Sequence, residues 1–177
     1  MLLGISGSLR KEATNRKLIR AAAALYGTDY TEADLNLPLY DGDLETEHGV
    51  PAAVATLATQ IAQAEAVIIA TPEYNQSLSG VLKNALDWVS RTDGAPWRNK
   101  PVAIMAAAAG RAGGARATYA LRLAMVPFRP RISAGPELLL AASAQQFDDT
   151  GMLTNDLALK TLTEAMDTLR HEARSQF

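Results

Sequence analysis

The chain of 177 residues contains no cysteine, so it has no disulfide, no thiolate nucleophile and no cysteine-ligated zinc or iron–sulfur site. Any redox chemistry would therefore depend on a bound cofactor. The sequence also lacks the run of about 18 apolar residues that a membrane-spanning helix needs. Its first residues, MLLGISGS, have neither the basic region nor the long apolar region of a signal peptide. We therefore expect a cytoplasmic protein that does not insert into membranes.

Charge of one sign is not in excess, since 17 Lys and Arg stand against 19 Asp and Glu for a net charge of -2. This balance provides no basic surface for nucleic acid, so we expect no nucleic-acid partner. Histidine is scarce as well, and His48 and His171 each lie alone in a polar or helical stretch. We interpret both as solvated side chains rather than catalytic ones. The length suits one domain, which we place at residues 1–177.

Short apolar runs alternate with helical patterns along the chain. Apolar residues at helical spacing follow most of the runs, and the first helix is expected to stop at Gly27. This alternation predicts an α/β fold in which a five-stranded parallel sheet carries helices on both faces. The runs expected to form strands are MLLGI, YTEADL, EAVIIATP, KPVAIMAAAA and PRISAGPELLLA.

Three polar or glycine-rich loops follow predicted strands, at residues 6–14, 71–77 and 107–114. In open α/β sheets, ligands bind beyond the carboxyl ends of the strands, where the strand order reverses. The unusual residues of this chain are concentrated in these loops. We therefore expect the functional site at that edge.

The first loop, GISGSLRKEATN, has the chemistry of a phosphate cradle. Gly7 permits a tight turn, and the N-terminus of the following helix favours an anion. The loop lacks G-x-G-x-x-G and G-K-[ST], and hydroxyls with Arg10 as the candidate cation suit a monophosphate better than a triphosphate. An ordinary strand–helix turn capped by Thr14 is the alternative. The candidate side-chain donors are Ser6, Ser8, Thr14 and Asn15.

The second loop, TPEYNQSLSGVLKNALDW, places an aromatic side chain where a strand has just ended. Tyr74 and the nearby backbone amides could receive a planar heterocycle, although Tyr74 could instead pack beneath a simple turn. In the helix that follows, Lys83 and Asp87 form an exposed i,i+4 pair. We interpret Trp88 as a core or subunit contact rather than a ligand contact.

Taken together, GSLRKEATN, PEYNQSLSGVLKNALDWVSR and GRAGGARATYALR resemble, in order and spacing, the three signatures of the NAD(P)H-dependent FMN reductase family. That family includes chromate and quinone reductases and has a three-layer flavodoxin-like fold. The resemblance runs from the first strand to about Arg122, and FDDTGMLTND near the end is similar too.

The resemblance implies which residues bind FMN. Ser8, Arg10 and Asn15 would contact the phosphate, and the segment Gly110 to Gly114 would border the flavin. The isoalloxazine ring would be lined by Pro72, Glu73, Tyr74, Asn75 and Ser77.

The resemblance also implies the reaction. NADPH or NADH would transfer hydride to flavin N5, and a small acceptor such as a quinone, chromate, an azo compound or free flavin would take the electrons. No side chain need act as acid or base, because the flavin carries the chemistry. Arg111 and Arg116 are candidates for contact with the NAD(P)H phosphates or for an oligomer salt bridge. A homodimer or homotetramer is implied as well.

Three positions depart from the family pattern. Ala13 stands where a serine usually precedes the asparagine, so that one hydroxyl contact is lost or taken over by Thr14. Ala108 replaces a serine before the first glycine of the third loop, and Ser79 replaces a proline. Each lost hydroxyl would remove a hydrogen bond worth on the order of 1 kcal/mol. Weaker retention of the flavin is expected.

Two other function classes stay open on the sequence. A flavodoxin-like electron carrier would bind the flavin without oxidising NAD(P)H, but such carriers usually present an acidic face that this balanced chain lacks. A carbohydrate or nucleotide-sugar binder on a similar sheet would bind no flavin at all.

Overall fold

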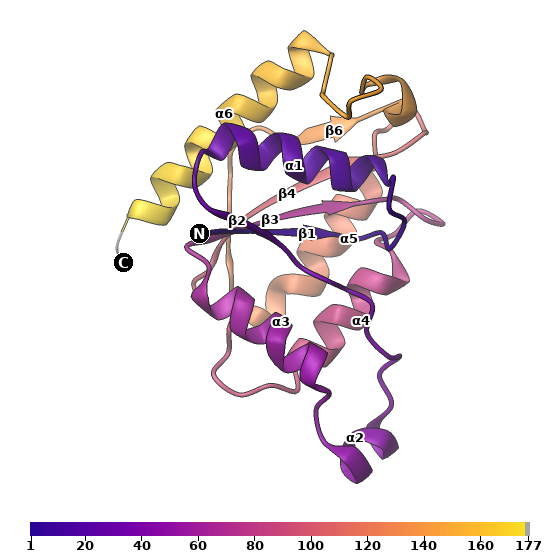
Figure 1. Ribbon diagram of the computed structural model, residues 1–177, viewed down its shortest axis with the longest axis vertical. Coiled ribbons are helices and arrows are strands. Elements are labelled where there is room, and N and C mark those ends of the chain that lie inside the picture. Colours follow the sequence, from indigo (N-terminus) through magenta and orange to yellow (C-terminus); the bar gives the residue numbers. More distant parts are fainter. Residues whose placement is uncertain (176–177) are drawn as a thin grey trace.

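The computed structural model describes residues 1–175 and shows a parallel sheet in the order β2-β1-β3-β4-β5, with β6 also paired to β4 (Figure 1). This is the flavodoxin-like strand order, and the predicted fold is confirmed. The predicted single domain, 1–177, extends two residues beyond the described part. The strands are β1 (Leu2–Ser6), β2 (Tyr30–Glu32), β3 (Ala66–Thr71), β4 (Pro101–Ala107), β5 (Arg131–Ile132) and β6 (Leu138–Leu140).

The predicted fifth strand is divided into two segments. β5 pairs with the start of β4, at Pro101 and Val102, while β6 pairs with its end, from Met105 to Ala107. Pro136 lies between the segments and has no N–H to donate to a ladder. The expected five strands are therefore six, with two short ones sharing the same edge of β4.

Helices cover both faces of the sheet (Figure 1). α1 (Thr14–Tyr26) and α6 (Asp156–Arg174) pack on one face, and α3 (Ala52–Gln63), α4 (Gly80–Val89) and α5 (Ala115–Met125) pack on the other. Short 3₁₀ turns occur at Val126–Phe128 and Ser143–Gln145. None of the helices within residues 1–175 is long and apolar enough to cross a lipid bilayer.

Strand β3 explains why the sheet lies in the middle of the molecule. All six of its residues are buried, and successive side chains of a strand point to opposite faces. Ile68 joins the core beneath α1 and α6, whereas Val67 and Ile69 join the core beneath α3, α4 and α5. A strand that is apolar on both faces fits a sheet covered on both sides.

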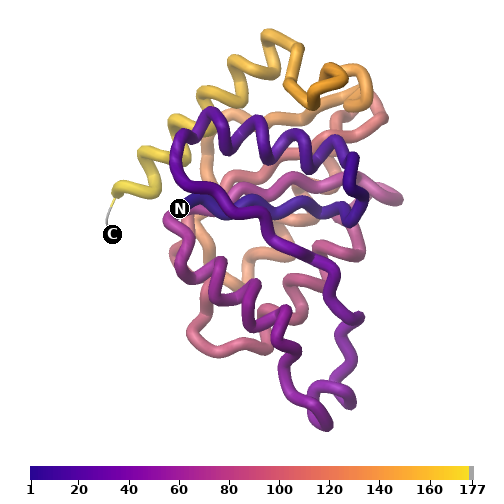
Figure 2. The backbone as a smooth tube through the Cα atoms, in the orientation of Figure 1, coloured from indigo at the N-terminus to yellow at the C-terminus, as the bar shows by residue number. Residues whose placement is uncertain are grey.

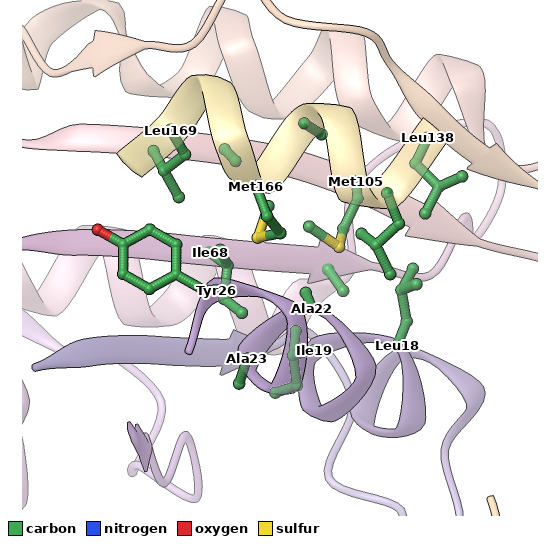
Figure 3. Packing of buried hydrophobic residues seen from close by; sticks show 14 of the residues in the cluster. Leu18, Ile19, Ala22, Ala23, Tyr26, Ile68, Met105, Leu138, Met166 and Leu169 are labelled. Atoms are coloured by element: carbon green, nitrogen blue, oxygen red, sulfur yellow. The ribbon is translucent and has the colours of Figure 1, made fainter. Parts of the chain in front are cut away.

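The first of these cores joins the two ends of the described chain. Leu18 and Ala22 of α1 share one core with Met166 and Leu169 of α6, over strands β3 and β4 (Figure 3). Helix α1 ends at Gly27, as predicted, and this glycine has a left-handed φ of 72° that ends the helix without strain.

A short helix was not expected in the turn-rich segment before α3. α2 (Gly42–His48) has no buried residue and projects from the body of the molecule (Figure 2). Its N-terminus is capped by Asp41, whose side chain accepts from the N–H of Asp43. The base of the projection is held by Trp88, which donates its indole N–H to the carbonyl of Pro38 at 2.7 Å. Trp88 is only 2% exposed, which confirms its expected place in the core.

The core beneath α1 and α6 generates a stability prediction. Leu162 is fully buried in it, whereas Leu157 of the same helix is 74% exposed. Leu162→Ala should lower the free energy of unfolding by about 2–5 kcal/mol, because it removes buried methyl groups and leaves a cavity. Leu157→Ala is the matched control and should change it by less than about 0.5 kcal/mol. Urea denaturation of both variants measures the difference, and equal effects would contradict this packing.

Candidate active site

Four loops meet at the carboxyl edge of the sheet, because all strands run parallel and end on the same side. Three of them are the predicted loops after β1, β3 and β4. The fourth follows β6 and carries Ser143, which the sequence analysis did not identify. Ser143 is only 5% exposed and belongs to no motif; its place directly after a strand at this edge was the one available signal.

The first loop is packed closely against the second. Gly7 donates its N–H to the carbonyl of Ala70 at 2.8 Å, and a Cβ at Gly7 would lie 3.0 Å from Cδ of Pro72. Ser8 is almost fully buried, and its Oγ accepts from the N–H of Arg10 at 3.4 Å. The loop therefore has a defined shape, while the Arg10 side chain is exposed at its rim.

The N-terminus of α1 has unused main-chain donors. Its N-cap, Ala13, makes no side-chain capping bond, and no acidic residue lies in the first turn. Within residues 1–175 the N–H groups of Thr14 and Asn15 find no acceptor. The alternative of a cap by Thr14 is wrong, because its hydroxyl instead donates to Oγ of Ser143 at 3.2 Å. Such a helix end is suited to a phosphate.

Asn15 has a different role from the one expected of its side chain. The amide is 2% exposed and exchanges two hydrogen bonds with the main chain of Ala107 at the end of β4. Nδ2 donates to the carbonyl at 2.8 Å, and Oδ1 accepts from the N–H at 2.9 Å. The side chain thus joins α1 to the third loop, and the residue's main-chain N–H is what it offers to a phosphate.

The second loop contains a tight turn with an unusual backbone. The main chains of Tyr74 and Ser77 exchange hydrogen bonds of 3.1 and 3.0 Å, and the central residues Asn75 and Gln76 have φ angles of 48° and 64°. Positive φ at both positions defines a type I′ turn, which costs strain without glycine. Tyr74 is 53% exposed, so the alternative in which it packs beneath the turn is wrong. Strain and an exposed aromatic ring together indicate a functional turn.

Glu73 connects this turn to the third loop. Its Oε2 accepts from the N–H of Arg116 at 3.0 Å and from that of Ala117 at 3.4 Å, at the N-terminus of α5. Its Oε1 lies 3.5 Å from Nη1 of Arg116. The carboxylate therefore caps α5 and is not free to contact a ligand, whereas Pro72 beside it is buried.

The third loop surrounds a depression of about 410 Å³ that is also bordered by Glu73 and Arg116. Gly113 and Gly114 have positive φ angles of 59° and 94°. Any Cβ at Gly113 would lie 2.4 Å from the carbonyl oxygen of Leu139. Gly110, the predicted cofactor contact, is exposed, and a Cβ there would meet no atom of residues 1–175 within 4 Å.

Ser79 joins the first and second loops. Its hydroxyl donates to the carbonyl of Gly7 at 2.6 Å and accepts from the N–H of Leu82 at 3.2 Å, which caps α4. The four loops are thus joined by four connections, which are made by the side chains of Asn15, Glu73 and Ser79 and by the Thr14–Ser143 pair. The edge is held in shape by the protein's own contacts.

Comparison with known proteins identifies the family of this chain. The family model for NADPH-dependent FMN reductase matches residues 1–145. The chain belongs to that family. Among its relatives, an NAD(P)H-dependent FMN reductase of Pseudomonas aeruginosa is 40% identical over 172 residues, 96% of this chain and 92% of the relative. A quinone reductase of Escherichia coli is 40% identical over 162 residues, 89% of this chain and 86% of the relative.

Solved structures agree with this assignment. The flavoenzyme NAD(P)H:(acceptor) oxidoreductase FerB from Paracoccus denitrificans superposes with a TM-score of 0.86 at 29% identity, covering 97% of this chain and 96% of FerB. An NADH:FMN oxidoreductase superposes with a TM-score of 0.70 at 21% identity over 99% of this chain and 90% of the other, which supports the fold.

FMN, the cofactor of the family, fits the residues present at this edge. The free N–H groups of Thr14 and Asn15 at an uncapped helix end are suited to a phosphate. The exposed ring of Tyr74 beside the strained turn is suited to a flat heterocycle. The two features follow neighbouring strands, β1 and β3, where the strand order reverses.

The third loop generates a prediction from two of its glycines. Gly113→Ala should lower the free energy of unfolding of the apoprotein by at least about 2 kcal/mol, because alanine must adopt a left-handed φ against the Leu139 carbonyl. Gly110→Ala, in the same loop with open space around it, should change it by less than about 0.5 kcal/mol. Chemical denaturation without flavin measures both, and a tolerated alanine at 113 would contradict the loop conformation.

Proposed function

We propose that this protein is an NAD(P)H-dependent FMN oxidoreductase that reduces quinones and similar small acceptors. One observation carries the proposal above all. Two adjacent strands of the sheet end at the same edge, and one is followed by an uncapped helix N-terminus while the other is followed by a strained type I′ turn with an exposed tyrosine. The names of the relatives support the substrate class, since quinone reductases occur among them at 40% identity. The protein would be cytoplasmic and consist of one flavodoxin-like domain, 1–177.

The residues of the first loop bind the phosphate in this proposal. The main-chain N–H groups of Thr14 and Asn15 donate to it at the helix end, where the helix dipole also favours negative charge. Ser8 contributes from the buried wall of the loop, and Arg10 supplies the cation from the rim. Two N–H donors, a hydroxyl and one guanidinium suit a single terminal phosphate.

The second and third loops orient the ring. Pro72 and the main chain of Glu73 form the wall against it, while Tyr74, Asn75 and Ser77 present the tight turn, and Gly110 borders it from the third loop. Bound FMN supplies the hydride acceptor and the two-electron chemistry. These residues would hold and orient the ring, and because the flavin carries the chemistry, no side chain need act as acid or base.

The two arginines of the third loop differ in their availability. Arg116 lies beside Glu73, which its main chain and guanidinium both contact. Arg111 is exposed at the depression, and its side chain has no partner within residues 1–175. Arg111 is therefore the better candidate for the phosphates of NADPH or NADH. The rival function, an electron carrier that does not oxidise NAD(P)H, needs no cation to bind nicotinamide phosphates.

A flavin-binding and turnover experiment tests the proposal. FMN added to the purified apoprotein should lose fluorescence in a saturable manner, and the complex should oxidise NADPH or NADH rapidly when a benzoquinone is present. Absorbance of the nicotinamide measures the rate. Flavin binding with only slow oxidation would support the electron carrier instead. Absence of flavin binding would reject both and leave the carbohydrate or nucleotide-sugar binder.

An exposed apolar stripe on α5 supports a homodimer or homotetramer. Tyr119, Leu123 and Val126 are 60%, 75% and 66% exposed, and their spacing puts them on one side of the helix and its continuation. Adjacent apolar side chains exposed in this way are typical of a contact with another protein surface. We propose that a second copy of the chain covers this stripe.

Leu123→Glu should therefore shift the protein toward the monomer, because it places a charge in an apolar contact. Light scattering coupled to size-exclusion chromatography measures the mass. Leu157→Glu changes an equally exposed leucine on α6, at 74%, and should leave the assembly intact. A monomeric wild type, or dissociation by both variants alike, would refute the α5 interface.

A further inference from the structure

The hydroxyl of Ser79 makes a contact that the motif around it does not predict. Ser79 follows the second loop directly before α4, and its side chain is 1% exposed. Its Oγ lies 2.6 Å from the carbonyl oxygen of Gly7, which belongs to the first loop, 72 positions earlier in the chain. A proline has no donor with which to make this bond. The contact therefore depends on the hydroxyl at position 79.

Both polar main-chain groups of Gly7, its N–H and its carbonyl, are held by residues of β3 and the start of α4. Its N–H donates to Ala70 at 2.8 Å, and its carbonyl accepts from Ser79. A Cβ at Gly7 would lie 3.0 Å from Pro72 and 3.1 Å from Oγ of Ser79, so the loop has no space in which to shift toward α4. The rotation of the peptide between Gly7 and Ser8 is thereby fixed.

The orientation of the Gly7 carbonyl also determines the orientation of the next main-chain N–H in the first loop, that of Ser8. The peptide is trans, and in a trans peptide the carbonyl of Gly7 and the N–H of Ser8 point in opposite directions. Because the carbonyl faces Ser79, the N–H of Ser8 faces away from α4. That N–H makes only a long contact of 3.4 Å, to Oγ of Ser6. It remains available to an anion.

We infer that Ser79 is a positioning residue for the cofactor phosphate, because its hydroxyl orients the Gly7–Ser8 peptide. This rests on FMN binding at the carboxyl edge, as proposed above. Removing the hydroxyl leaves the buried carbonyl of Gly7 without a partner, and a peptide flip is one way to recover one. The effect should fall on the phosphate and not on the ring, which lies against the second loop.

Comparing FMN with riboflavin separates this role from a general structural one. The two ligands share the ring and the ribityl chain, and only FMN has the phosphate. Ser79→Ala should weaken FMN binding by about tenfold, the usual effect of losing one hydrogen bond to a buried group. Riboflavin affinity should be unchanged. Fluorescence titration of each ligand against the apoprotein measures both.

Two further substitutions at Ser79 identify the hydroxyl as the cause. Ser79→Thr keeps the hydroxyl and should keep the preference for FMN. Ser79→Pro suits the backbone, since Ser79 has a φ of −67° and its N–H donates to no acceptor in the described part of the chain. It removes the hydroxyl and should lose the preference as alanine does. If the alanine variant fails to fold, Ser79→Pro provides the same comparison of FMN with riboflavin.

A matched control removes a helix cap elsewhere. Asn155 caps α6 through a bond from the N–H of Ala158 at 2.9 Å, so Asn155→Ala should lower stability and leave the FMN to riboflavin ratio unchanged. Equal weakening of both ligands by Ser79→Ala, or a wild-type preference in Ser79→Pro, would overturn the inference and leave the proposed function standing. A wild type that binds FMN no better than riboflavin would overturn the phosphate cradle itself, and this inference with it.

Discussion

The pair of hydrogen bonds between the Asn15 amide and the main chain of Ala107 is the contact on which the site depends. A primary amide carries a donor and an acceptor side by side, so Asn15 pairs with Ala107, the last residue of β4, as a neighbouring strand would. Asn15 also lies in the first turn of α1. The bonds therefore place the anion-binding end of that helix relative to the start of the third loop.

The other connections at this edge work in the same way, since each joins groups that are distant in sequence. Glu73 holds the turn of the second loop to the start of α5, and Ser79 holds the first loop to the start of α4. A site built from four loops would otherwise lose conformational entropy when a ligand arrives. Contacts made before binding reduce that loss, and the strained φ angles of Asn75 and Gln76 persist because their surroundings are fixed.

The sequence predicted the order of elements, the edge and the loops, because periodicity and strand ends are local signals. It did not predict the partners of the polar side chains. Asn15 and Glu73 were expected beside the flavin, yet their side chains bind Ala107 and the start of α5, which lie far along the chain. Ser143 and the helix α2 were missed for a related reason. Their positions depend on tertiary contacts, which the spacing of residues along the chain does not predict.

The same distinction between local sequence signals and tertiary contacts applies to the two serine hydroxyls that the resemblance led us to expect at Ala13 and Ala108. Counting motif positions treats Ala13 and Ala108 as losses at separate points of the site. In the folded protein, the hydroxyls of Thr14 and Ser143 meet at 3.2 Å, and the N–H of Ser143 donates to the carbonyl of Ala108 at 3.1 Å. The fourth loop thus brings a hydroxyl and a main-chain bond to the positions where the two serines are absent. Counting motif positions does not record these contacts of Ser143, because they come from a loop that lies far along the chain from Thr14 and Ala108.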